Sequence, residues 1–193
     1  MSEVLNLRKG DKVAIGYTNI TVGLGWEPNE GTGGTYDLDV SAIMIDDKRK
    51  LPNKDYFVFF NNLTSPDGAL VHTGDDPDGT SSAGSDDESI VLDLTKINAD
   101  IQEILFVVTI DAAFDKKQNF GQVRDSYIRL VDNNSGKEIM KYELGEDFSI
   151  ETGIEFGRLY RRNNEWKFDA SGIGYQEDLS FFLGKYFSGT IQK

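Results

Sequence analysis

The sequence contains no cysteine, a single histidine and few prolines. The absence of cysteine excludes disulfides, thiolate zinc sites, iron–sulfur clusters and cysteine nucleophiles. One histidine, His72, is too few for an imidazole cluster of the kind that zinc or copper prefers. No apolar run approaches the roughly 20 residues that a membrane span needs. The first residues also lack the apolar run of a signal peptide, so we expect a cytoplasmic location.

Basic residues are scarce relative to acidic ones. The 20 Lys and Arg face 33 Asp and Glu, which gives a formal net charge of −13. Binding to nucleic acid needs a clustered basic face, so we expect no nucleic-acid partner. The same charge disfavours constitutive docking to an anionic membrane. A bound metal ion would change the charge locally, so any membrane association is expected to depend on that ion.

The hydrophobic pattern predicts an all-β protein. Period-2 alternation and short apolar runs, bounded by Gly, Asn and Asp, predict strands at 13–17, 20–26, 36–45, 56–60, 89–94, 104–110, 126–131, 138–144, 153–161 and 165–170. The segments 56–60 and 104–108 are apolar on both faces, which predicts central strands. Helical spacing is confined to 95–102 and to 178–187, where Asp178 is a suitable N-cap. Without a βαβ rhythm, these elements predict a two-sheet antiparallel β-sandwich with one or two short helices, as a single domain over 1–193.

The segment from Gly74 to Glu88 is the most informative part of the chain. Its fifteen residues hold six carboxylates and no Lys or Arg, and a predicted strand begins directly after it. The carboxylates belong to Asp75, Asp76, Asp78, Asp86, Asp87 and Glu88. Carboxylates within about 4 Å of one another repel by roughly 1 kcal/mol per pair even in water. The segment is therefore either a solvated surface loop or the site of a cation.

Calcium is the cation that suits this composition. It takes about 6–8 oxygen ligands in flexible geometry, whereas magnesium demands near-octahedral geometry and keeps its waters. The segment is not an EF-hand, because Gly79 at position 6 would place Gly74 at position 1 and Ser85 at position 12. A site must then be assembled from loop ends that meet in space. Asp37 and Asp39, two apart on a predicted strand, share a face and supply a second acidic pair.

The candidate calcium ligands therefore come from two stretches of the chain. They are Asp37, Asp39, Asp75, Asp76, Asp78, Gly79, Asp86, Asp87 and Glu88. Catalysis is not expected: His72 has no evident nucleophile beside it, and no phosphate-binding loop with a Lys-Ser/Thr ending is present. Paired carboxylates also suit glycoside hydrolysis, but the nearby aromatic residues belong to a predicted core strand. We expect a non-enzymatic protein.

Several blocks in order along the chain resemble the TerD-type tellurium-resistance and stress-response family. They include Leu5–Gly10, Val22–Trp26, Tyr36–Ala42, Asn61–Gly68, Val71–Asp75 and Asp86–Glu88. The resemblance implies a cytosolic, non-enzymatic β-sandwich that is tied to resistance to tellurium oxyanions. It also implies calcium binding through Asp-rich loops at one end of the sandwich. By the family pattern, the metal positions fall on Asp39 with Asp37, and on Asp75, Asp86, Asp87 and Glu88, while His72 is a motif residue of the loop.

The acidic segment also departs from the family pattern. Asp76-Pro77-Asp78-Gly79 stands where the family usually reads Asn-Leu-Thr-Gly, which adds two carboxylates and a proline that stiffens the turn. One or two calcium ions are expected. Partners are expected to be calcium and other proteins, including paralogues of the same family. The alternative is a module that associates with membrane phospholipids when calcium is bound.

Overall fold

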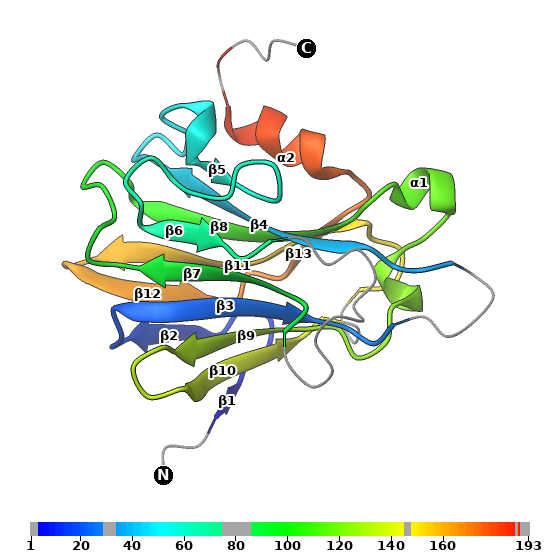
Figure 1. Cartoon of the computed structure of the whole chain (residues 1–193), viewed down its shortest axis with the longest axis horizontal. Helices are drawn as coiled ribbons and strands as arrows, with labels where there is room; N and C mark the ends of the chain where they lie inside the picture. The colour runs from blue at the N-terminus through cyan, green and yellow to red at the C-terminus, as the bar shows by residue number, and fades with distance from the viewer. Residues whose placement is uncertain (1–3, 29–33, 75–85, 145–147, 188, 190–193) are drawn as a thin grey trace.

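The computed structural model describes residues 4–28, 34–74, 86–144, 148–187 and 189. Two β-sheets stack face to face, which confirms the predicted all-β sandwich (Figure 1). In order, the first sheet contains β1 (Leu5–Asn6), β10 (Lys137–Glu143), β9 (Tyr127–Asp132), β3 (Asn19–Gly25), β7 (Glu88–Asp93) and β6 (Leu70–His72). The second contains β2 (Lys12–Ile15), β12 (Glu165–Asp169), β11 (Gly153–Arg162), β8 (Glu103–Ile110), β4 (Leu38–Ile45) and β5 (Phe57–Val58), and β13 (Ile173–Tyr175) pairs with β11.

Among the described strands, every pairing but one is antiparallel. The short N-terminal strand β1 runs parallel to β10, at the edge of the first sheet. The core lies between the sheets and follows the alternation of the sequence. On β3, for example, Ile20, Val22 and Leu24 are completely buried. The central strands β4 and β8 are almost entirely buried, so both of their faces are covered. The expectation that 104–108 forms a central strand is confirmed.

The segment 56–60 was expected to be central, and this expectation was wrong. Tyr56 ends a short 3-10 helix, η1 (Lys54–Tyr56), and only Phe57 and Val58 form a strand, β5, at the end of the second sheet. Phe59 then bridges to Asn62 in a tight turn. The ring of Phe59 packs 5.1 Å from that of Phe57 and 5.2 Å from that of Phe60, measured between centroids. Tyr56 and Phe57 are nevertheless buried in the core, and Phe59 packs against it.

Two short α-helices lie within the described residues, α1 (Ala113–Lys116) and α2 (Leu179–Tyr186), together with a second 3-10 helix, η2 (Phe120–Gln122). The prediction for α2 is confirmed, including its cap: the Asp178 carboxylate accepts hydrogen bonds from the N–H groups of Ser180 and Phe181. The segment 95–102 forms turns instead of a helix. Among the described residues, no helix combines the length and the apolar character that crossing a membrane would take.

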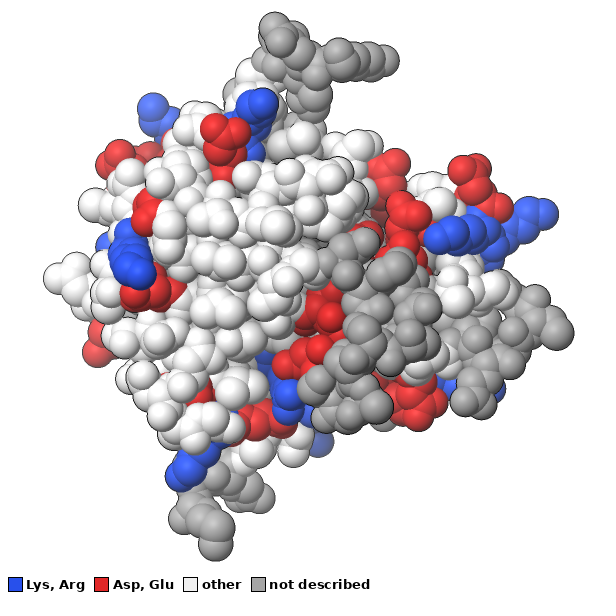
Figure 2. All heavy atoms as spheres, viewed as in Figure 1, with Lys and Arg blue, Asp and Glu red and all other residues white. Residues whose placement is uncertain are grey.

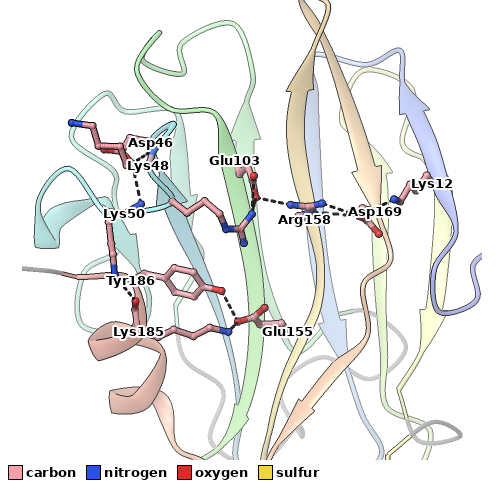
Figure 3. Close-up of polar contacts among 11 residues, drawn as sticks. Lys12, Asp46, Lys48, Lys50, Glu103, Glu155, Arg158, Asp169, Lys185 and Tyr186 are labelled. Carbon is pink, nitrogen blue, oxygen red and sulfur yellow. Dashed lines mark hydrogen bonds and ion pairs between the residues drawn. The ribbon is translucent and has the colours of Figure 1, made fainter.

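A buried carboxylate fastens α2 to the second sheet. Glu155 on β11 is only 3% exposed, and its Oε1 accepts hydrogen bonds from Lys185 Nζ at 2.6 Å and from the Tyr186 hydroxyl at 2.7 Å (Figure 3). A buried carboxylate is costly unless it is paired and hydrogen-bonded, and α2 supplies both kinds of partner. The register of β11 against β8 also shifts directly after Glu155, between Glu155 and Gly157.

A second row of charges crosses the same sheet. Arg158 on β11 contacts Glu103 on β8 at 2.9 Å and Asp169 on β12 at 3.2 Å. Lys12 extends the row at one end through Asp169 (Figure 3), and Arg49 extends it at the other through Glu103. Alternating positive and negative charges on neighbouring strands stabilise the strand order by cross-strand pairing.

We expect Tyr186→Phe to flatten the alkaline side of the stability profile. Burial, followed by the hydrogen bond to Glu155 and its charge, raises the pKa of Tyr186 to about 12. In the unfolded chain a tyrosine titrates near pH 10, so the folded state holds this proton more tightly. The resulting stabilisation is complete below pH 10 and is lost as the pH rises towards about 12.

The measurement is the free energy of unfolding in urea at pH values between about 9 and about 12. Tyr186→Phe should show a smaller fall over this range than the unchanged protein. Tyr17→Phe, at an exposed tyrosine, is the control and should retain the full fall. An unchanged pH slope in Tyr186→Phe would contradict the assignment.

Candidate metal site at the end of the sandwich

The acidic segment rejoins the described structure at Asp86, which is neutralised by a basic residue of the first sheet. Its Oδ1 accepts hydrogen bonds from Arg129 Nε at 2.7 Å and from the Tyr127 hydroxyl at 3.1 Å. Arg129 also binds Glu138 at 3.0 Å. Burial alone would lower the pKa of Arg129, but the bonds to Asp86 and Glu138 raise it above its usual value. Burial, then the charge of Asp86, raises the pKa of Tyr127 to about 12.

Two glycines of β3 make room for this arrangement. A side chain at Gly23 would overlap the Asp86 carboxylate, and one at Gly25 would overlap the ring of Tyr127. Both glycines belong to the block Val22-Gly-Leu-Gly-Trp26, which sequence reasoning used only as a mark of family resemblance. Their physical role is to let a carboxylate and an aromatic ring lie directly on the strand. The pairing of Asp86 with Arg129 could not be inferred from the sequence, because the two residues are 43 positions apart.

Asp87 and Glu88 turn towards the backbone of neighbouring strands. Asp87 Oδ2 accepts a hydrogen bond from Trp26 N at 2.9 Å, and the N–H of Asp87 donates to Leu24 O at 2.8 Å. Glu88, which begins β7, is 1% exposed. Its Oε2 accepts a hydrogen bond from Val40 N, on the opposite sheet, at 2.8 Å. The two carboxylates therefore fix the end of the acidic segment to both sheets.

His72 completes this contact between the sheets. Its Nδ1 accepts the N–H of Gly74 at 3.1 Å, so the ring proton is on Nε2. Nε2 lies 3.1 Å from Val40 O and 3.7 Å from Glu88 Oε2. β5 pairs only with Ala42 and Ile43, so its ladder does not reach Val40. Glu88 and His72 take the place of a neighbouring strand there: one accepts from the Val40 N–H and the other donates to its carbonyl.

Of the remaining candidate ligands, two lie at or just before the start of β4 in the second sheet, and the other four are not among the residues that the structure describes. Asp39 pairs with Thr109 on β8 and is 5% exposed, and Asp37 is half-buried just before β4. Asp39 lines a cleft beside α1 and the first residues of α2. Asp75, Asp76, Asp78 and Gly79 lie outside the described residues. Among the residues that are described, no three acidic or histidine side chains come together closely enough to hold a metal ion.

Acidic side chains nevertheless gather at this end of the molecule. Figure 2 shows many of them on the right half of the view, while much of the face at its centre and left is uncharged. Asp39 directly precedes Val40, and Val40 N is bound by Glu88. Glu88 therefore holds the end of the acidic segment next to the strand that bears Asp39.

The fold and this acidic end define a class: a two-sheet β-sandwich whose carboxylates are held at one end by backbone N–H groups, an arginine and a buried histidine. Comparison with known proteins gives the family. The TerD domain family matches residues 4–186, so this chain belongs to the TerD family.

Relatives cover nearly the whole chain. General stress protein 16U of Bacillus subtilis (strain 168) is 42% identical over 188 residues, which is 94% of this chain and 96% of the relative. Tellurium resistance protein TerD of Serratia marcescens is 41% identical over 187 residues, with the same two coverages. A crystal structure of a homologue of telluride resistance protein (TerD) from Streptomyces coelicolor A3(2) superposes with a TM-score of 0.73. At 17% identity, over 87% of this chain and 96% of that one, it supports the fold.

We expect Gly23→Ala to destabilise the protein by about 1–3 kcal/mol, the usual cost of overpacking a filled site. The added methyl group would displace the Asp86 carboxylate, which can move only by giving up Arg129. Gly16→Ala is the matched control, because a side chain there meets nothing within 4 Å. It should change the free energy of unfolding by less than about 0.5 kcal/mol.

A double-mutant cycle measured by urea denaturation makes the cause specific. In an Asp86→Ala background the carboxylate is absent, so adding Gly23→Ala should cost clearly less than it does in the unchanged protein. Equal costs in the two backgrounds would show that the Gly23 methyl group clashes with something other than Asp86.

Proposed function

We propose that this member of the TerD family is a non-enzymatic, calcium-binding protein of the cytoplasm that acts in the response to stress, including exposure to tellurium oxyanions. The biological part of the proposal rests on the names of the relatives, which are tellurium resistance and general stress proteins. The chemical part rests on the acidic end of the sandwich. The absence of cysteine disfavours thiol-based reduction of an oxyanion by this chain.

One observation carries the calcium proposal: the buried Glu88 carboxylate fixes the last residues of the acidic segment to the strand that bears Asp39. This buried carboxylate thus brings two acidic stretches to the same end of the sandwich. A carboxylate offers two oxygens and about four lone-pair positions, so carboxylates gathered at one end can together supply several oxygen donors. Oxygen donors of this kind suit calcium.

The described residues also assign different roles within the proposed ligand set. Asp86 is bound by Arg129 and Tyr127, which favours a role in neutralising and anchoring the segment. Asp87 and Glu88 hold the base of the segment in place. Asp75, Asp76, Asp78 and Gly79 are the proposed direct ligands within the segment, with Asp39 and Asp37 contributing from β4. One or two ions would remove the repulsion among these carboxylates.

Binding of calcium would stabilise the folded state by ligand linkage and would change the surface at this end. We propose that other proteins, including paralogues, recognise the calcium-loaded surface. Serratia marcescens alone supplies three relatives, the tellurium resistance proteins TerD, TerX and TerZ. Attachment to phospholipid headgroups through the bound ion is the alternative.

We expect chelator-stripped protein to bind calcium saturably in isothermal titration, and to bind magnesium much more weakly. Asp39→Asn and Asp87→Asn should each weaken calcium binding by about tenfold, because each removes one negative charge from the site. Asp47→Asn removes the same charge from an exposed turn and is the control. Its calcium affinity should match that of the unchanged protein.

Two results would contradict the proposal. One is the absence of both binding heat and a calcium-dependent rise in melting temperature. The other is an equal loss of affinity in Asp47→Asn, which would indicate a diffuse effect of net charge. Co-sedimentation with vesicles of anionic phospholipid, with and without calcium, separates the membrane alternative from recognition by proteins.

A further inference from the structure

A cleft of about 460 Å³ lies at the end of the second sheet, and neither Glu88 nor His72 is among its lining residues. Its walls come from the ends of β4 and β8, from the turn that leads into α1, and from the first residues of α2. All of its lining residues are described. It is large enough for a side chain of a partner or for a small ligand.

The cleft is strongly acidic. Asp39, Asp111, Asp115 and Asp178 all line it. One nearby lysine, Lys116, pairs with Asp111 at 3.5 Å. The N-terminus of α2 does not make the cleft attractive to anions, because its N–H groups are already bound by the Asp178 carboxylate. The charge of the lining therefore selects a cation.

The acidic groups are spread around the cleft. No three of the described acidic side chains come together as metal ligands do. Apolar residues lie between them: Phe60, Leu179 and Phe114 all line the cleft. Phe114 is 58% exposed, so its ring is accessible to a bound group. A cation for this cleft would carry its charge on a flat or apolar body that packs against phenylalanine.

We propose that this cleft binds an arginine side chain of a partner protein. A guanidinium group is planar, stacks on aromatic rings and donates several hydrogen bonds in a fork that suits carboxylates. Its methylene stem would pack against Phe114 and Leu179, while Asp111 and Asp115 neutralise its charge. Arginine is enriched among the residues that dominate protein interfaces, where it pairs with carboxylates and packs on aromatic rings.

This inference goes beyond the proposed calcium site, with which the cleft shares Asp39, because the cleft is lined entirely by described residues and its proposed occupant is an arginine side chain. The two proposals can fail separately. Binding of arginine is measured in the presence of a chelator, and binding of calcium is measured by titration without peptide.

The test uses a fluorescently labelled peptide that contains two arginines, and fluorescence anisotropy with the full chain in chelator. The same peptide with citrulline in place of arginine keeps the shape and removes the charge. A third peptide carries lysine. We expect saturable binding of the arginine peptide, weaker binding of the lysine peptide, and none of the citrulline peptide.

Two variants connect binding to the cleft. Phe114→Ala and Asp115→Asn, both at exposed positions, should each weaken binding of the arginine peptide about fivefold. Tyr17→Ala and Asp100→Asn remove an exposed aromatic ring and an exposed charge elsewhere, and should leave binding unchanged. Equal losses in the controls would overturn the proposal in favour of general attraction to a chain of net charge −13. Equal binding of the lysine peptide would overturn the choice of arginine.

Discussion

The hydrogen bond from Val40 N–H to the buried carboxylate of Glu88 is the contact on which the acidic end of this protein depends. It joins the two sheets where the ladder of β5 no longer covers β4. His72 completes it by facing the carbonyl of the same residue. Without these side chains, a buried peptide group would lack partners, at a cost of about 1–3 kcal/mol for each unsatisfied group.

The same contact explains how so acidic a segment can stand beside a compact sandwich. The three carboxylates at the end of the segment all have partners in the sandwich. Asp86 is bound by an arginine, Asp87 by the N–H of Trp26 directly after β3, and Glu88 by the N–H of Val40 on β4. These partners lie on strands of both sheets, so the end of the segment is fixed in position whatever the rest of it binds. Calcium binding would then act on a preformed base.

Two further carboxylates, buried Glu155 and exposed Asp178, hold α2 in place. Glu155 holds α2 against the second sheet through Lys185 and Tyr186, and Asp178 caps the other end of the same helix. Because Asp178 also lines the acidic cleft, the position of α2 shapes that cleft. The charge of −13 is therefore not spread evenly: part of it is used inside the fold, and part is concentrated at one end.

The sequence by itself determined the fold class, the helix capped by Asp178 and the family. Alternation of apolar residues and capping chemistry are local, so they can be recognised without tertiary contacts. The segment 56–60 shows the limit of that reasoning. Its apolar run predicted a central strand, but only Phe57 and Val58 form a strand, and that strand lies at the end of the sheet. Only the tertiary structure decided that Asp86 meets Arg129 over Gly23. It also decided that Glu88 and His72 bind the peptide group of Val40, and that Asp39 lines a cleft. These pairings join residues that are distant in sequence, and their geometry depends on how the two sheets stack.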